Sequence, residues 1–506
     1  MKGDFSRVSF DPAKHFSRVL MQQGRVTLEA DHNEQTAIAL HLLRTLTGDL
    51  FGAYGGPAGG RGFFLYLANS RLMIGAGHYY VDGILCECEA KPGGGEYDYS
   101  SQPDFTPVND AFLSWLAHPG TPPGQRFWVY LDVWERHISW VEDDRIREVA
   151  LNGPDTCTRA KVIWQVKAMI LDPNAKDQSC TGFLNRVVTL SIAHMAARLD
   201  PGPQIPDPCT IAPDARYRGA ENQLYRIEIH QAGDAGSATF KWSRDNGSIV
   251  TRWLSTEGND LIVTNARGFT AGDWVELSDD NMDLGGSPGV LFKLASVQSD
   301  RLTIAPDSNK DQTIPVWQAP VNPKIRRWDQ IENDAITLVQ GAVRIVEMTA
   351  ANPNWIDIED GIQIQFTAGG TYRTGDYWLI PARVATGGID WPPTIGADGQ
   401  PETGPDGQLI PAALAPAGIK HHYAPLGIVP DAALGVQDCR SCNSPLAIGK
   451  CGQTAGATVA PVAIIPKATL PAASLSGNIA PKKTLTPPGS SAGGKPVSKA
   501  KQKPKG

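Results

Sequence analysis

The clearest periodic pattern in the chain is a stripe of apolar residues near its start. Five of them recur at i, i+3, i+4, i+7 and i+11, namely Ala39, Leu42, Leu43, Leu46 and Leu50. This spacing places them on one side of an α-helix and predicts an amphipathic helix. Asp31 is placed to cap this helix, Glu34 to reach back in a capping box, and Gly52 to end it.

The residues before the helix predict an extended arm. Pro12 disfavours helix in the residue before it, and Gly24 suits a turn because glycine permits a positive φ. Residues 5–28 carry apolar side chains with few sequence neighbours to bury them. Arms of this kind often add to the surface of a partner or a symmetry mate, so we expect an assembly interface. Its candidate residues are Phe10, Phe16, Arg18, Leu20 and Met21.

The body of the chain shows the short alternating runs that are typical of β-strands. The long runs at 127–141 and 160–171 are expected to pair. Residues 238–253 predict a hairpin around Asn246-Gly247, a dipeptide that a type I′ turn favours. Short runs separated by turn residues at about 256–308 predict a small barrel or sandwich.

The Pro-rich stretch 201–213 is the first candidate for a domain boundary. We therefore expect a mainly β protein with several β-sandwich or small-barrel modules after the arm and helix. The expected parts are an arm and helix at 1–52, a first β-rich domain at 53–200, a second β-rich region at 214–438 and a disordered Lys/Pro/Ala-rich tail at 453–506.

The tail changes the distribution of charge. It holds eight lysines, no acidic residue and no aromatic residue. Such a composition buries too little apolar surface to offset the entropy of ordering. The whole chain carries −7, so removing those eight positive charges leaves −15 for the rest. An acidic body argues against nucleic acid as a specific partner. For the tail itself, a solvated linker and attraction to an acidic or anionic surface both stay open.

The start of the chain and the cysteines bear on its location. The first residues lack an apolar signal region, and no stretch approaches the ~18 apolar residues of a membrane span. We therefore expect a cytoplasmic protein without a membrane span. Eight cysteines in 506 residues do not predict a disulfide scaffold. Cys439, Cys442 and Cys451 have the spacing of zinc ligands, with His421 or His422 as a fourth, but free thiols are the preferred interpretation.

The motifs that suggest enzymes do not survive inspection. Gly285–Gly289 matches the G-x-S-x-G hydrolase pattern, but the residue after the serine is Pro288, which has no N–H for an oxyanion hole. Gly489–Pro496 ends in proline where a phosphate-binding loop needs Ser or Thr. Asp279–Asp283 lacks the glycine and glutamate of a calcium loop, so an acidic turn is the default. The sequence predicts no catalytic residue, cofactor or metal.

Several blocks also carry a family resemblance. They are residues 9–35, Tyr130–Arg136, Ile146–Leu151, Ala160–Lys167, Glu221–Arg226, Phe240–Gly247 and His421–Leu426. In this order they resemble an uncharacterised family associated with phage tails and phage-tail-like contractile injection systems, over roughly residues 1–440. The resemblance implies a setting, not a reaction.

From the resemblance we expect a non-enzymatic structural or adaptor component of such a particle, associated with its baseplate or fibre. It would dock on protein subunits of the assembly through the N-terminal arm. Homo-oligomerisation stays open, and the assembled particle can be released from the cell. The alternative is a tail-associated β-protein that binds or degrades carbohydrate, which would need two carboxylates facing each other across a cleft.

Overall fold

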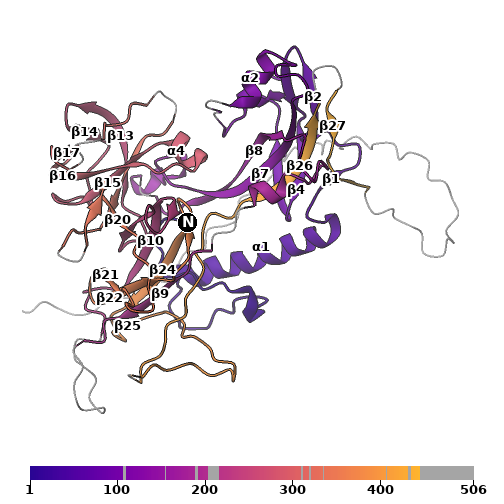
Figure 1. The fold of residues 1–506 in the computed structure, drawn as a ribbon. Coiled ribbons are helices and arrows are strands. Elements are labelled where there is room, and N and C mark those ends of the chain that lie inside the picture. The colour runs from indigo at the N-terminus through magenta and orange to yellow at the C-terminus, as the bar shows by residue number, and fades with distance from the viewer. Residues whose placement is uncertain are drawn as a thin grey trace, which may run out of the picture. The chain divides into compact units, whose positions relative to one another are not determined.

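The computed structural model describes residues 1–444 with short gaps (Figure 1). The residues outside the description are 106, 108–109, 154, 189–191, 203–215, 309–311, 318–320, 334–335, 406, 431–434 and 445–506. The tail expected at 453–506 therefore lies outside the described residues. The described part is mainly β, as the sequence predicts.

The N-terminal segment contains a short 3-10 helix, η1 (Pro12–Lys14), and a long helix, α1 (Glu29–Phe51). α1 ends at Gly52 as predicted, with φ 77° and the Gly52 N–H bonded to the carbonyl of Gly48. Glycine adopts this left-handed conformation without steric cost.

The predicted start of α1 is wrong. Leu28 occupies the N-cap position without a side-chain cap, and Asp31 lies inside the first turn, where a negative charge favours the helix dipole. Glu34 accepts a hydrogen bond from the Ser9 hydroxyl at 2.5 Å instead of closing a capping box. The arm therefore binds the Glu34 carboxylate that the predicted capping box required.

The first β region is built around two long strands, β7 and β8, which pair over 13 residues from Arg126↔Leu171 to Ile138↔Arg159, as predicted. Almost every residue in the first part of β7 is buried, because both faces of its sheet are covered. The remaining strands form a sheet in the order β28-β1-β4-β5 and another in the order β2-β3-β6, while β27 and β26 extend the β7-β8 sheet.

The elements of this region have the following bounds. They are β1 (Tyr54–Pro57), β2 (Leu65–Ala68), β3 (Arg71–Ile74), β4 (Gly77–Val81), β5 (Ile84–Cys88), β6 (Tyr97–Asp98), η2 (Tyr99–Ser101), α2 (Ala111–Ala117), β7 (Arg126–Ile138), η3 (Asp144–Ile146), η4 (Val149–Leu151), β8 (Arg159–Leu171), α3 (Leu184–Val187), β26 (His422–Val429), β27 (Gln437–Asp438) and β28 (Cys442–Asn443). β26 pairs with β7 although the sequence places it in the second region, 214–438.

The second β region contains a sheet in the order β19-β20-β12-β10-β24-β25, packed with the smaller sheet β21-β22-β9 around one apolar core. A two-stranded sheet pairs β11 with β23. The bounds are β9 (Met195–Leu199), β10 (Gln223–Gln231), β11 (Gly233–Asp234), β12 (Thr239–Ser243), β19 (Leu338–Val339), β20 (Ala342–Arg344), β21 (Ile356–Asp357), β22 (Ile362–Phe366), β23 (Thr371–Tyr372), β24 (Tyr377–Arg383) and β25 (Gly388–Ile389).

A closed barrel interrupts this region, in the strand order β13-β14-β17-β16-β15-β18 (Figure 1). Its elements are β13 (Val250–Glu257), β14 (Asp260–Val263), β15 (Trp274–Ser278), α4 (Asp280–Gly285), β16 (Val290–Gln298), β17 (Arg301–Ile304) and β18 (Lys324–Trp328). The sequence predicts this small barrel at about 256–308, but two strands beyond that range are needed. β18 closes it by pairing with both β13 and β15.

The predicted hairpin around Asn246-Gly247 is wrong in its pairing. Both residues have the positive φ that the dipeptide favours, 51° and 64°. Yet β12 pairs with β10 and β20, and β13 pairs with β14 and β18. The turn therefore passes the chain from the sheet into the barrel.

The first residues of the chain lie against the body. The carbonyl of Met1 accepts a hydrogen bond from Arg226, and the carbonyl of Gly3 accepts one from the Asn246 side chain at 2.9 Å. Lys2 forms an ion pair with Glu228 at 3.0 Å. These residues hold the Asn246 turn in place, so the chain ahead of residue 5 is part of the core structure and not of a free arm.

Deleting residues 2–6 should therefore lower the free energy of unfolding by about 2–4 kcal/mol. The buried carboxylate of Glu228 loses one of its cations, and the buried side chain of Asn246 loses its hydrogen bond to Gly3. Urea denaturation followed by tryptophan fluorescence measures this. The matched control is Phe16→Ser with Leu20→Ser in the exposed arm, which should leave the midpoint unchanged. An unchanged midpoint for the deletion would contradict the anchored arrangement.

Candidate functional site

The structure exposes most of the predicted assembly interface. Phe16, Leu20 and Met21 have 57%, 69% and 59% of their surface exposed, and Arg18 is exposed too. Phe10 differs, because its ring is half-buried and lies 5.7 Å from the ring of His41 on α1. Four of the five predicted residues thus face outward, while Phe10 fastens the arm to the helix.

The apolar stripe of α1 also faces outward. Leu42, Leu43, Leu46 and Leu50 are each more than half exposed, and Ala39 is exposed as well. The buried residues of α1 are Ala30, Ile38 and Thr47. An amphipathic helix ordinarily turns its apolar stripe toward the core. Here no described residue of the chain covers the outward side of these leucines, and the stripe faces solvent.

Polar contacts hold the arm and α1 together. The Ser6 N–H donates to Glu29 at 2.8 Å, and the Val19 N–H donates to the side chain of Gln35 at 2.8 Å. Together with the Ser9–Glu34 bond they attach both halves of the arm to the first turns of α1. We call residues 7–51 the N-terminal docking module.

The far end of α1 is attached to the first β region. Arg44 forms an ion pair with Glu135 on β7 at 2.9 Å. The ring of Phe51 stacks on Tyr80 of β4, with centroids 5.2 Å apart. These contacts fix the orientation of the helix and so present its leucine stripe in one direction.

Behind the docking module lies a cavity of about 900 Å³, lined by α1, the end of β7 and strands of the second region and barrel. Its wall is ionic. Glu228 on β10 accepts from Arg226 at 2.5 Å and also pairs with Lys2 and Lys241. Lys241 on β12 lies 2.5 Å from Glu276 on β15. Lys241 and the two carboxylates are almost fully buried.

A second ionic group joins the first β region to the barrel. Arg136 at the end of β7 contacts Asp280 and Asp283 on α4 at 2.5 and 3.0 Å. Lys324 on β18 contacts Glu142 at 2.8 Å and Asp283 at 2.5 Å. The acidic turn at Asp279–Asp283 thus binds cations of this chain. We call these two groups of charges the ionic core.

The ionic core keeps its carboxylates charged. Burial alone would raise the pKa of Glu228, but Lys2, Arg226 and Lys241 hold it well below its usual value. Burial also tends to raise the pKa of Glu276, but Lys241 and Lys2 lower it to about 2. In the same way, Lys324 outweighs the effect of burial and lowers the pKa of Glu142 to about 2. Burial and Arg326 lower the pKa of His137 to about 3.

These protonation states limit what the cavity can do. A general acid must hold a proton near neutral pH. Glu142, Glu228 and Glu276 instead stay ionised, and His137 stays neutral. The carboxyl of Glu359 does have a pKa raised to about 7 by burial, but it lines neither this cavity nor a shallower one of about 460 Å³ at Arg252–Leu254. The arrangement of the ionic core therefore suits a structural role, in which buried ion pairs join neighbouring parts of the fold.

Sequence reasoning missed the ionic core, although a signal exists. Lys241 stands between Phe240 and Trp242, and Glu276 follows Trp274 and Val275, so each charge interrupts an aromatic or apolar strand. Charged side chains at such positions face a neighbouring layer when the sheet is covered on both faces. A single sequence gives no partner for them.

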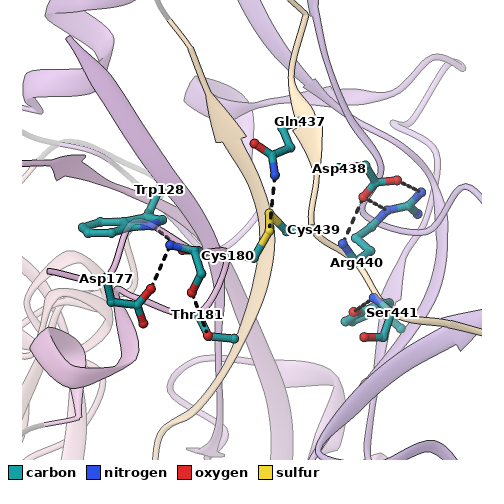
Figure 2. The surroundings of a disulfide bond; sticks show 11 residues. Trp128, Asp177, Cys180, Thr181, Gln437, Asp438, Cys439, Arg440 and Ser441 are labelled. Atoms are coloured by element: carbon teal, nitrogen blue, oxygen red, sulfur yellow. Dashed lines mark hydrogen bonds and ion pairs between the residues drawn. A yellow bond between two sulfur atoms is a disulfide. The ribbon is translucent and has the colours of Figure 1, made fainter. Parts of the chain in front are cut away.

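The cysteines correct another expectation. Cys439 forms a disulfide with Cys180, although the sequence favoured free thiols and left a zinc site with Cys442 and Cys451 open (Figure 2). Cys442 is a free, exposed thiol, and Cys451 lies outside the described residues. His421 and His422 bond to Asp132 and Asp82 at 2.7 Å each. No metal-binding group of three or more His, Cys, Asp or Glu occurs in the described part of the chain.

The model of a family of unknown function (DUF6519) matches the chain over residues 1–187 and 179–506. No curated protein and no solved structure matches it.

The ionic core makes the fold sensitive to acid. Carboxylates whose pKa is lowered in the fold contribute stability that is complete above their unfolded pKa and is lost as the pH falls through the folded value. For Glu142 and Glu276 this window runs from about 4.5 to about 2. His137 adds a loss between about 6.5 and 3, because only the unfolded chain binds its proton there.

We therefore expect the unfolding midpoint in urea to fall from pH 6.5 downward and to fall most steeply below pH 4.5. Glu228→Gln should cost about 3–5 kcal/mol at pH 7, because it leaves three cations without their shared carboxylate. Glu257→Gln, in an exposed pair with Arg301, is the control and should cost under about 1 kcal/mol. An equal loss in the free energy of unfolding for the two variants would show that the buried ion pairs do not stabilise the fold more than an exposed pair does.

The disulfide closes a loop of 259 residues, which constrains the unfolded chain. Cys180→Ser should therefore lower the free energy of unfolding by about 2–4 kcal/mol under oxidising conditions. Cys157→Ser, at an exposed free thiol, is the matched control and should have little effect. In dithiothreitol the difference between wild type and Cys180→Ser should vanish. A difference that persists under reduction would mean that packing, not the bond, causes it.

Proposed function

We propose that this chain, which belongs to the DUF6519 family, is a non-enzymatic structural or adaptor component of a phage-tail-like contractile particle. The N-terminal docking module attaches it to protein subunits of that assembly. The blocks quoted from the sequence support the setting, and the exposed apolar surface of the docking module supports the role.

The surface is the observation that carries the proposal. The arm exposes Phe16, Leu20, Met21 and Val26, and α1 exposes four leucines. At ~150 Å² for a large apolar side chain, these exposed fractions amount to roughly 400 Å² on the arm and roughly 350 Å² on α1. The largest apolar patch on a typical monomer is about 300–600 Å² and is itself often functional. The module is also held in one conformation, which lowers the entropic cost of binding.

One further observation fits a particle that is released from the cell. The Cys180–Cys439 disulfide suits a protein that spends time outside the reducing cytoplasm. Within the described residues, no helix has the length and apolarity needed to cross a membrane.

The alternative, binding or degradation of carbohydrate, lacks a comparable observation among the described residues. The buried carboxylates on the cavity wall are paired with cations and hold no proton to donate. Trp134 lines the cavity but is almost fully buried, which leaves little of its ring for stacking on a sugar. The test below includes this alternative as an outcome.

Particles assembled with Leu20→Asp and Met21→Asp in the arm should contain at least about 10-fold less of this protein than wild-type particles, because a charge on each contact residue opposes burial. Quantitative mass spectrometry of purified particles measures this. The matched control is Val316→Asp, at a valine that is 95% exposed outside the docking module, and it should be incorporated normally. Normal incorporation of the arm variant would overturn the proposal. Clearing or binding of polysaccharide by the purified protein would favour the alternative.

A further inference from the structure

The leucine stripe of α1 has the pattern of a helix that pairs with another helix. Ala39, Leu43, Leu46 and Leu50 are spaced 4, 3 and 4 residues apart, which is the repeat of the a and d positions in a coiled coil. Leu42 widens this seam on one side. Because Gly52 ends the helix, the seam covers about three turns.

The positions that flank the seam are almost free of charge, so they give no preference for a partner with a different sequence. In this register the flanking e and g positions are Leu40, Leu42, Thr47 and Asp49. Charges at these positions normally set partner choice. Asp49 is the only charged residue among the four, and it lies at the end of the helix. Arg44 occupies position b, outside the seam, and is paired with Glu135 on β7. The face is therefore apolar and neutral, and two identical copies meet without like-charge repulsion.

The exposed area agrees with a small isologous contact. Leu42, Leu43, Leu46 and Leu50 leave roughly 350 Å² of apolar surface uncovered, taking ~150 Å² for each whole side chain. Apolar atoms make up about 60% of a typical interface, so the contact would bury about 600 Å² on each copy. The total of about 1,200 Å² lies at the lower edge of specific interfaces.

We propose that the leucine seam of α1 binds the same seam of a second copy of this chain. The arm, with Phe16, Leu20 and Met21, then stays available to another subunit. The inference goes beyond the proposed function, because it concerns the purified protein alone and uses a different face of the docking module.

The test is the molar mass of the full chain, measured by size-exclusion chromatography with light scattering from about 1 to 100 μM. Wild type should rise from 54.4 kDa toward twice that mass as concentration increases. Leu43→Glu with Leu46→Glu should weaken association at least about 100-fold, because two charges would be buried without partners. Leu151→Glu is the matched control: its leucine is 62% exposed on η4, outside the seam, and the variant should associate like wild type.

A complementary pair of variants separates a lost interface from a misfolded chain. Leu43→Lys with Leu46→Lys should be monomeric alone, but mixing it with the glutamate variant should restore association through opposite charges. Restored association supports the seam as the interface between copies. Monomeric wild type at 100 μM, glutamate variants that still associate, or a mixture that stays monomeric would each overturn the inference. Particle incorporation of a monomeric wild type would leave the proposed function standing, so the two failures are distinguishable.

Discussion

The ionic core holds the described part of this protein together. Glu228 pairs with Lys2, Arg226 and Lys241, and Lys241 also pairs with Glu276 on the neighbouring β layer. Glu228, Glu276, Arg226 and Lys241 are almost fully buried. A buried charge without a partner costs several kcal/mol, so removing any one member leaves the others in an unfavourable state. The first residues of the chain, the six-stranded sheet and the barrel therefore form their correct structures only together.

The position of the docking module follows from this constraint. Lys2 and the carbonyls of Met1 and Gly3 fix the start of the chain against Arg226 and Asn246. The arm is attached to the first turns of α1 through Ser6, Ser9 and Val19. Arg44 and Phe51 attach the other end of the helix to the first β region. The outward direction of the leucine stripe thus follows from the contacts at both ends of α1.

The separation of roles within the molecule has a simple physical basis. The charges at the cavity wall satisfy one another, which makes the interior rigid and leaves it with no proton to transfer. Apolar surface on the docking module has no partner within the described chain. Stability rests on the apolar cores of the two β regions and the barrel together with these buried ion pairs, whereas the proposed recognition surface is apolar and exposed. β26 and the Cys180–Cys439 bond close the structure by returning the last described segment to the first β region.

The sequence by itself determined the features that depend on local spacing. The helix and its end at Gly52, the pairing of the two long strands β7 and β8, and the barrel all follow from periodicity and from turn residues. Only the tertiary structure decided which face of α1 is covered, because the same stripe suits a core and an interface equally well. It also decided that the turn at Asn246-Gly247 separates two sheets. The dipeptide specifies a positive φ, whereas the pairing of β13 depends on residues more than 70 positions away, such as Lys324–Arg326. The tertiary structure also decided the partners of Glu228, Glu276 and Cys439. Ion pairs and disulfides join residues that are close in space, and no regular spacing in the sequence identifies both partners.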